Sequence, residues 1–119
     1  MRSRLTKSFT FEAAHWLPAV PTGHKCGRMH GHTYRIELAL EGEVDEVFGW
    51  VIDFADVKTA FRPVLELLDH ACLNDIAGLE NPTAENLAYW LYQKLVSDLP
   101  LLTEVTVFET TSSSASYRS

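Results

Sequence analysis

The stretch that decides the fold reads HGHTYRIELALE over residues 30–41. Polar and apolar positions alternate through it, which is typical of a β-strand with one buried face, because successive side chains on a strand point to opposite sides. The apolar face carries His30, His32, Tyr34, Ile36, Leu38 and Leu40, and the other face carries Thr33, Arg35, Glu37 and Glu41. The pattern predicts a half-buried strand that begins with two histidines on its apolar face.

A second alternating segment lies just upstream, at residues 4–15, and His15 is the last residue of its apolar face. Residues 16–29 hold two prolines, two glycines and a cluster of polar and basic side chains, so they predict a loop. If the two strands pair as a hairpin around this loop, His15 lies beside His30 and His32.

Helical signals fill the middle of the chain. Residues 49–52 predict a short strand, after which Asp53 caps a first helix in which Pro63 makes a kink or a break possible. Thr83 caps a second helix, which ends at Pro100. Strand patterns return over residues 102–110 and at Ala115 and Tyr117. The order of elements predicts a single α+β domain over residues 1–119, with helices packed on one face of an antiparallel sheet.

Composition excludes several classes of function. The chain has 119 residues and a net charge of -6, and it is 46% hydrophobic and 22% charged. An acidic surface is a poor match for nucleic acid, which requires clustered lysine and arginine, and for anionic membranes. No apolar run approaches the roughly 20 residues that span a bilayer, and the first residues do not resemble a signal peptide. We therefore expect a cytoplasmic protein with Cys26 and Cys72 reduced.

The three histidines on the predicted hairpin form a candidate metal site. His30 and His32 are two residues apart on one strand, so their rings point to the same face and can converge on one ion. Together with His15 they make a ligand set that suits zinc and leaves a position open for water or substrate. The alternative is three separate histidines, each satisfied by hydrogen bonds.

Cys26 lies four residues before His30, among Lys25 and Arg28, and nearby cations lower a thiol pKa. We interpret it as a general base or nucleophile. A fourth zinc ligand in a closed site and an inert loop thiol are the competing interpretations.

Two further positions carry acid–base or recognition chemistry. Asp69 and His70 adjoin at the end of the first predicted helix, where a carboxylate and an imidazole can transfer protons, although such pairs are more often helix caps. Glu109 continues the apolar face of the strand over 102–110. One interpretation is a carboxylate exposed at the sheet edge. The other is a recognition residue whose two oxygens accept from two adjacent N–H donors, such as those that the edge of a pterin presents.

These residues resemble the 6-pyruvoyltetrahydropterin synthase superfamily, and within it most closely the bacterial 6-carboxytetrahydropterin synthase branch. The resemblance covers nearly the whole chain and includes the three residues between Cys26 and His30 that mark this branch. It rests on the segments at residues 11–15, 23–32, 49–54, 68–70, 73–74, 80–86, 109–110 and 117–118.

The resemblance implies a tunnelling fold, in which an antiparallel four-stranded sheet with two helices on one face oligomerises into a β-barrel. It implies Zn²⁺ held by His15, His30 and His32, proton transfer by Cys26, Asp69 and His70, and a pterin held by Glu109. The implied homo-oligomer is a hexamer or tetramer with active sites at subunit interfaces. These roles come from the likeness to the family and not from spacing alone.

The implied reaction converts 7,8-dihydroneopterin triphosphate to 6-carboxy-5,6,7,8-tetrahydropterin, acetaldehyde and triphosphate, towards queuosine. Lys25 and Arg28 are candidates to meet the triphosphate. Alternatives are elimination of triphosphate without C–C cleavage, a promiscuous pterin side-chain lyase, and a zinc- and pterin-binding module without turnover. The segment at 111–114 departs from the Cys, Thr and Gly that relatives often carry there, which affects the pocket wall.

Overall fold

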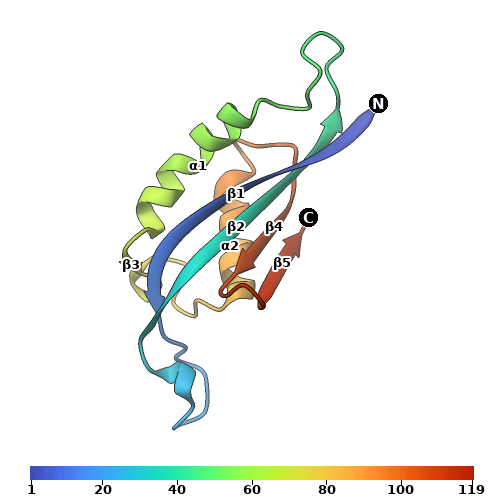
Figure 1. The fold of residues 1–119 in the computed structure, drawn as a ribbon. Coiled ribbons are helices and arrows are strands. Elements are labelled where there is room, and N and C mark those ends of the chain that lie inside the picture. Colours follow the sequence, from blue (N-terminus) through green and yellow to red (C-terminus); the bar gives the residue numbers. More distant parts are fainter.

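The chain begins with a long antiparallel hairpin in the computed structural model, which describes residues 1–119. Strand β1 (Arg2–His15) pairs along its whole length with β2 (His30–Glu43). The last pair of the ladder is His15 with His30, next to the loop at 16–29, which contains only the 3-10 turn η1 (Lys25–Gly27). The predicted hairpin is confirmed, and it brings the histidines of both strands to one end of the molecule (Figure 1).

Both predicted helices are present, and their caps are the predicted residues. Helix α1 (Phe54–Leu68) begins where the carboxylate of Asp53 accepts a hydrogen bond from the Ala55 N–H, at 2.9 Å. Helix α2 (Ala84–Leu95) begins where the Thr83 hydroxyl accepts from the Asn86 N–H, at 3.1 Å. Helix α1 continues through Pro63 without a break.

The sheet has five strands in the order β3-β1-β2-β4-β5, not the four that the resemblance implies. Strands β4 (Leu102–Phe108) and β5 (Ser114–Arg118) extend the antiparallel ladder beyond β2. The extra strand, β3 (Ala71–Cys72), is only two residues long and pairs parallel to β1. Two residues cannot display alternation, so no sequence pattern announces β3.

The short strand expected at residues 49–52 is wrong, because a tight turn occupies this part of the chain. The Asp45 carboxylate accepts hydrogen bonds from the N–H groups of Val47 and Phe48, and the Asp45 carbonyl accepts from Gly49. Gly49 has φ +80, in the left-handed region that glycine enters without strain. The turn uses the backbone groups that a strand would need for pairing.

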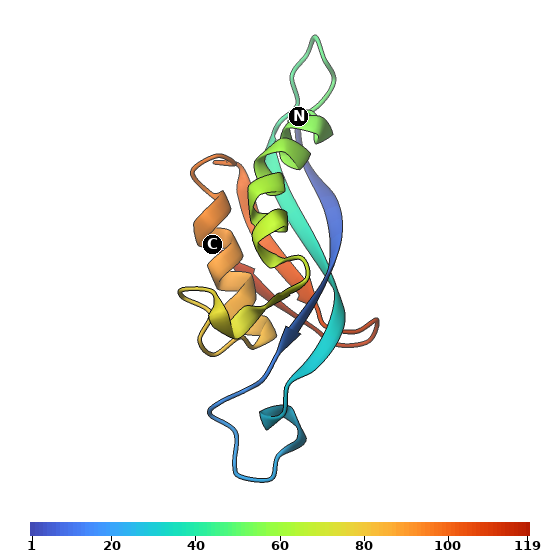
Figure 2. The same cartoon turned by 90° about the vertical axis from the view of Figure 1, so that its left-hand side faces the viewer.

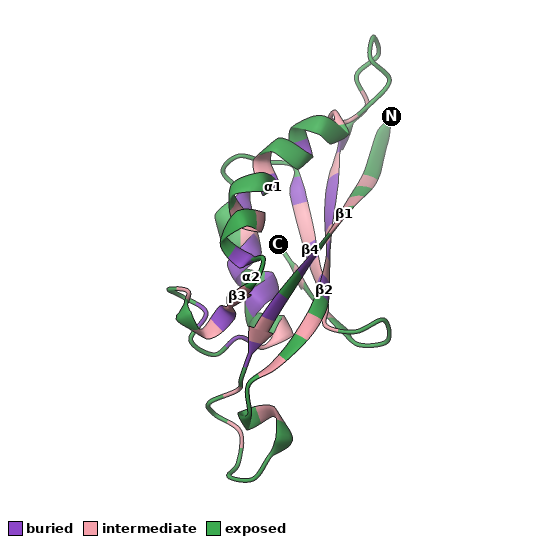
Figure 3. Ribbon diagram, turned by 60° about the vertical axis from the view of Figure 1, so that its left-hand side comes forward, coloured by how far each residue is buried: buried purple, intermediate pink, exposed green.

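The core fills the space between the sheet and the two helices, which lie on the same face of the sheet (Figures 1 and 2). Buried residues follow the helix-facing side of the strands, whereas the opposite side is largely exposed or half-buried (Figure 3). Phe11 and Ala13, which precede His15 on β1, and Tyr34, which follows His32 on β2, belong to this core. The histidine end of the hairpin therefore rests on a packed layer. None of the helices is both long and apolar enough to span a membrane.

Candidate functional site

The three histidines predicted to bind metal form one cluster. His15 and His30 face each other across the last pair of the β1–β2 ladder, and His32 lies two residues along β2 on the same face. Ring centroids are 4.6 Å apart for His15 and His30, 5.0 Å for His15 and His32, and 4.9 Å for His30 and His32. One nitrogen from each ring lies within 4.8 Å of the others, so the three could hold a metal ion.

Hydrogen bonds fix the tautomers of two of these rings. The Nδ1 atom of His15 lies 2.8 Å from the Pro82 carbonyl oxygen, and Nδ1 of His30 lies 2.7 Å from the Arg28 carbonyl oxygen. A carbonyl oxygen can only accept, so each Nδ1 carries the hydrogen and each neutral ring presents a lone pair at Nε2. These two Nε2 atoms are 3.0 Å apart. Two lone pairs at that distance require a cation between them, either a proton or a metal ion.

The third ring supports the metal interpretation. The Nε2 atom of His32 is buried and has no hydrogen-bond partner. Burial lowers the pKa of His32, and the nearby His15 and His30 lower it further, against an opposing effect of the Glu109 carboxylate. A neutral imidazole with an unpartnered nitrogen is ready to bind a metal, and a carbonyl on the other nitrogen is the usual second contact of such a ligand. The three residues therefore fit zinc.

A cavity of about 440 Å³ opens beside the cluster, and we call it the histidine cavity. Cys26 and Glu109 both line it. The Glu109 Oε1 atom is 3.9 Å from Nε2 of His15, and its side chain is 28% exposed. The complete lining is His15, Leu17, Lys25, Cys26, His30, His32 and Glu109.

The loop at 16–29 presents Cys26 to the histidine cavity from η1. The imidazole of His24 accepts a hydrogen bond from the Cys26 N–H at 3.0 Å, and the Cys26 carbonyl accepts from the Leu17 N–H at 2.8 Å. These contacts hold the half-buried thiol on the wall of the cavity. Of the two candidate phosphate-binding residues, Lys25 lines this cavity, whereas Arg28 lines a separate groove of the loop.

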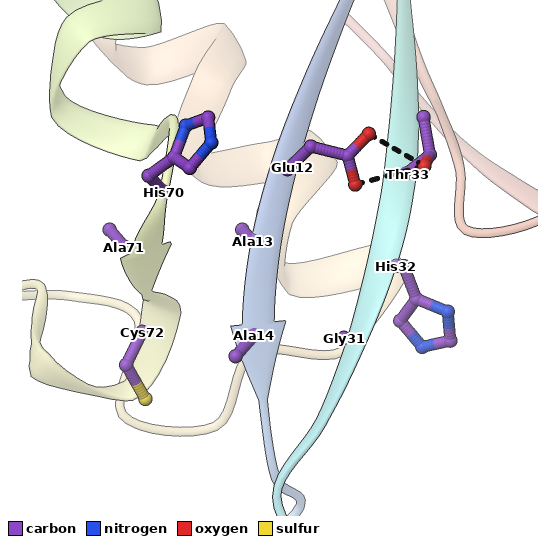
Figure 4. A pocket seen from close by; sticks show the side chains of 9 residues that line it. All are labelled: Glu12, Ala13, Ala14, Gly31, His32, Thr33, His70, Ala71 and Cys72. Carbon is purple, nitrogen blue, oxygen red and sulfur yellow. Dashed lines mark hydrogen bonds between the residues drawn. The ribbon is translucent and has the colours of Figure 1, made fainter.

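Asp69 and His70 are placed apart from the histidine cavity. His70 lines a second cavity of about 460 Å³, which we call the His70 cavity (Figure 4). Its other walls include Glu12 and Thr33, whose side chains hydrogen-bond each other at 2.7 and 2.9 Å between β1 and β2. Of the predicted site residues, only His32 lines both cavities. The sequence alone does not reveal this separation.

Local contacts hold the Asp69–His70 pair in place. The Asp69 carboxylate accepts a hydrogen bond from the Glu12 N–H at 3.0 Å and lies 3.0 Å from Nδ1 of His70. The Glu12 N–H lowers the pKa of Asp69, and His70 lowers it further. His70 has φ +60, which is unusual for a residue other than glycine, and its side chain is 79% exposed. Its imidazole therefore faces outward with a carboxylate behind it.

Two contributors to the site are not predicted from the sequence. The Pro82 carbonyl fixes the His15 ring, but a backbone acceptor has no residue type that marks it. Tyr34 is fully buried with its hydroxyl unpartnered, and its ring lies 5.5 Å from His32. Burial, and then the Glu109 charge, raise the pKa of Tyr34. A tyrosine on the core face of a strand, two residues after a histidine ligand, is the signal that could identify it.

Comparisons with known proteins agree with this geometry. The family model for 6-pyruvoyl tetrahydropterin synthase matches residues 4–119. A 6-carboxy-5,6,7,8-tetrahydropterin synthase from Synechocystis is 40% identical over 117 residues, covering 93% of this chain and 89% of the relative. A dihydroneopterin monophosphate aldolase from Pyrococcus furiosus is 35% identical over 100 residues, covering 84% and 81%. The structure of Caenorhabditis elegans 6-pyruvoyl tetrahydropterin synthase superposes with a TM-score of 0.92 at 30% identity, covering 100% of this chain and 96% of that one.

Proposed function

This chain belongs to the 6-pyruvoyl tetrahydropterin synthase family of pterin-processing enzymes, and we propose that it is a zinc-dependent carbon–carbon lyase. The proposed reaction consumes 7,8-dihydroneopterin triphosphate and one water. It yields 6-carboxy-5,6,7,8-tetrahydropterin, acetaldehyde and triphosphate. The 40% identity to a named 6-carboxytetrahydropterin synthase supports this reaction over others of the family, and supports a place for it in queuosine synthesis.

One observation carries the proposal: a single cavity holds a metal-ligand cluster, a thiol and a carboxylate. The Nε2 atoms of His15 and His30 face each other at 3.0 Å, and Cys26 and Glu109 line the same walls. A binding module needs the ligands and the carboxylate but has no use for a thiol there. The combination favours an enzyme.

The histidines would hold the zinc ion through their Nε2 atoms. When bound, zinc supplies a Lewis acid that makes a C–H bond beside an oxygen-bearing carbon of the substrate side chain more acidic. The protein contributes the orientation, because the carbonyls of Pro82 and Arg28 hold two of the three rings.

Cys26 is the proposed proton acceptor for the substrate side chain. Lys25 adjoins it on the cavity wall. A thiolate next to the metal cluster can remove a proton from the side-chain carbon that adjoins the pterin ring. Return of protons at ring atoms moves the double bond from the dihydropterin ring into the side chain. The ring thereby reaches the tetrahydro level while a side-chain carbinol is oxidised to a ketone, so no nicotinamide is needed.

Glu109 is the proposed anchor for the pterin ring. Its two oxygens can accept from two adjacent N–H groups of the pyrimidine edge, which is a specific, bidentate contact. The carboxylate lies 3.9 Å from Nε2 of His15, so the proposed ring anchor and the metal ligands belong to one cavity. This placement explains how one cavity can recognise the ring and act on the substituent.

Asp69 and His70 are proposed to complete the active site of an adjacent copy. They line or adjoin the His70 cavity and not the histidine cavity, so within one chain they do not meet Cys26. Open strand edges provide a way to bring copies together: β1 has no strand partner on its outer edge from Arg2 to Phe11, and neither does the outer edge of β5. Edge-to-edge pairing into a hexamer or tetramer removes these exposed edges.

A second candidate reaction is elimination of triphosphate without C–C cleavage, which gives 6-pyruvoyltetrahydropterin. The close superposition on the nematode 6-pyruvoyl tetrahydropterin synthase, at a TM-score of 0.92, favours keeping this candidate. Both reactions use the same first proton transfers, so the residues that begin them need not differ.

Mass spectrometry of the products tests the proposal directly. Purified protein loaded with zinc is mixed with 7,8-dihydroneopterin triphosphate, and 6-carboxytetrahydropterin with acetaldehyde is the expected outcome. Accumulation of 6-pyruvoyltetrahydropterin selects the second candidate. Pterin binding without turnover, equal in wild type and in Cys26→Ala, indicates a binding module and contradicts both reactions.

A further inference from the structure

A short segment that follows α1 runs beside the end of β1 and is attached to it residue by residue. Asp69 and His70 both bond the backbone of Glu12: the Asp69 carboxylate accepts from its N–H at 3.0 Å, and the His70 N–H donates to its carbonyl at 2.6 Å. Strand β3 then pairs with Ala13 and Ala14 (Figure 4). The segment would next reach the level of His15 and Trp16, but its backbone turns away.

Asn74 replaces the missing strand backbone at this point. The chain enters the 3-10 turn η2 (Leu73–Asp75) directly after β3, so it offers no extended residue opposite Trp16. The Asn74 side chain accepts a hydrogen bond from the Trp16 N–H at 3.0 Å and donates one to the Trp16 carbonyl at 2.8 Å. A carboxamide carries the same acceptor and donor as a peptide group, so it can act as a one-residue strand partner. It thereby holds the backbone of the residue that follows His15.

A second set of contacts holds the ring of His15 itself. The acceptor of its Nδ1–H is the Pro82 carbonyl, in the turn that leads into α2. Two hydrogen bonds to the Asn81 carbonyl hold this turn. The Asn86 side chain donates one at 2.8 Å, and the Thr83 N–H donates the other at 3.0 Å. Asn86 therefore fixes the position of the acceptor, as Asn74 fixes the position of the strand.

We propose that Asn74 and Asn86 are positioning residues that orient His15 as a metal ligand. The inference rests on the proposed metal site and adds two residues to it that touch neither metal nor substrate. His15 is 1% exposed, so its ring has little freedom except what its backbone and its Nδ1 partner permit. Asn74 controls the position of the backbone, and Asn86 controls the position of the Nδ1 partner. Partners that orient a metal-ligating histidine typically affect metal affinity by about 10–100-fold when removed.

The contacts of Asn74 also link the metal ligand His15 to the proposed proton-transfer residue His70. His70 and Asn74 belong to one short segment; His70 is bonded to Glu12 of β1, and Asn74 is bonded to Trp16, the residue that follows β1. The outward-facing imidazole and the metal ligand of one chain are thus held at a fixed separation. Loosening Asn74 is expected to disturb the metal ligand more than His70, because His70 keeps its own bonds to Glu12.

The test measures zinc affinity by competition with a chelator, together with the visible spectrum of the cobalt-substituted protein. We expect Asn74→Ala and Asn86→Ala each to weaken zinc binding by about tenfold and to shift the cobalt bands, which report ligand geometry. Thr103→Val is the matched control, because Thr103 also donates one side-chain hydrogen bond to a backbone carbonyl, that of Ala39 at 3.2 Å, but far from the site.

The possible outcomes separate the inference from the proposed function. Wild-type affinity and spectrum in both asparagine variants overturn the inference while leaving the metal site intact. An equal loss in Thr103→Val overturns it as well, because the loss is then general. A wild-type protein that binds no zinc removes the metal site and the inference together. Should Asn74→Ala fail to fold, Asn86→Ala decides, since the backbone N–H that Thr83 caps is kept in that variant.

Discussion

The two cavities at the histidine end of the hairpin differ in how complete they are. The histidine cavity collects ligands, a thiol and a carboxylate from β1, β2, the loop at 16–29 and the end of β4, all within one chain. The His70 cavity offers an exposed imidazole, a threonine–glutamate pair and an open sheet face. Neighbouring residues of the same strand supply both, because Ala13 and His15 point towards the core while Glu12 and Ala14 point away. One residue of offset thus separates the strand face that carries the metal ligand His15 from the face beside His70.

The largest expected effect is the loss of metal from the histidine cavity. His30→Ala removes one of the two facing Nε2 atoms, and we expect the variant to lose stoichiometric zinc and all turnover. Thermal unfolding without zinc is expected to change little, because His30 is only half-buried. Metal analysis and unfolding with and without zinc provide the measurement.

His24→Ala is the control, because His24 lies in the neighbouring loop but outside the histidine cavity. Zinc bound stoichiometrically by His30→Ala, or lost equally by His24→Ala, contradicts the assignment of the ligands.

Cys26→Ala is expected to lower kcat by about 10²–10⁴-fold, the range for a proton-transfer group, while zinc content stays at the wild-type value. Steady-state kinetics and metal analysis check the two halves of this expectation. Thr103→Val is the control, because Thr103 lines neither cavity. Wild-type turnover in Cys26→Ala is incompatible with the proposed role of the thiol.

Mixing two inactive variants tests whether the two cavities of different copies meet. Cys26→Ala and His70→Ala, unfolded and refolded together, are expected to recover roughly a quarter of wild-type activity, because a quarter of the mixed sites draw both intact residues from different copies. Each variant refolded alone remains inactive. If the mixture recovers no activity, Cys26 and His70 act in the site of the same copy, and the proposed separation of the two cavities is wrong.

The smallest effect concerns Asp69. The Glu12 N–H, with a further contribution from His70, lowers the pKa of Asp69, so its ionised form is favoured in the folded chain. A carboxyl group whose pKa is lower folded than unfolded adds stability above the unfolded pKa, about 3.9, and this is lost as pH falls through the folded value. We expect Asp69→Asn to unfold slightly more easily than wild type at pH 7.

Urea unfolding at neutral pH and near pH 2–3 measures this difference. The gap between wild type and Asp69→Asn is expected to close on acidification, because the wild-type carboxyl is then neutral. A gap that persists or grows at acid pH contradicts the assigned cause of the shift.

Strand alternation and helix caps predict most of this fold because they are local. The alternation within each strand of the hairpin, the cap at Asp53 and the cap at Thr83 each depend on residues within a few positions, and each is confirmed. Residues 49–52 are mistaken for a strand because they are apolar, but they follow a turn that the Asp45 side chain closes and form a bend. The extra strand β3 is too short to carry a pattern.

The metal cluster is predictable for the same reason, since two ligands share one strand and the third ends its neighbour. The assignment of Asp69 and His70 to a separate cavity is not, because it depends on which side of β1 the end of α1 attaches. That attachment runs through backbone groups of Glu12, and backbone contacts leave no trace in residue type. The Pro82 carbonyl and the side chain of Asn74 fall outside sequence reasoning on the same ground.

The hydrogen bond from His15 to Pro82 joins residues 67 positions apart, and it bears on the order of events during folding. Hairpin contacts close a short loop and can form early, whereas this contact must wait for α1, β3 and η2 to settle. Until then the His15 ring lacks the partner that fixes its tautomer. Metal uptake should therefore follow the last docking step and stabilise only completed chains by mass action. Zinc would then stabilise the native state after the chain has folded, and it would not nucleate folding.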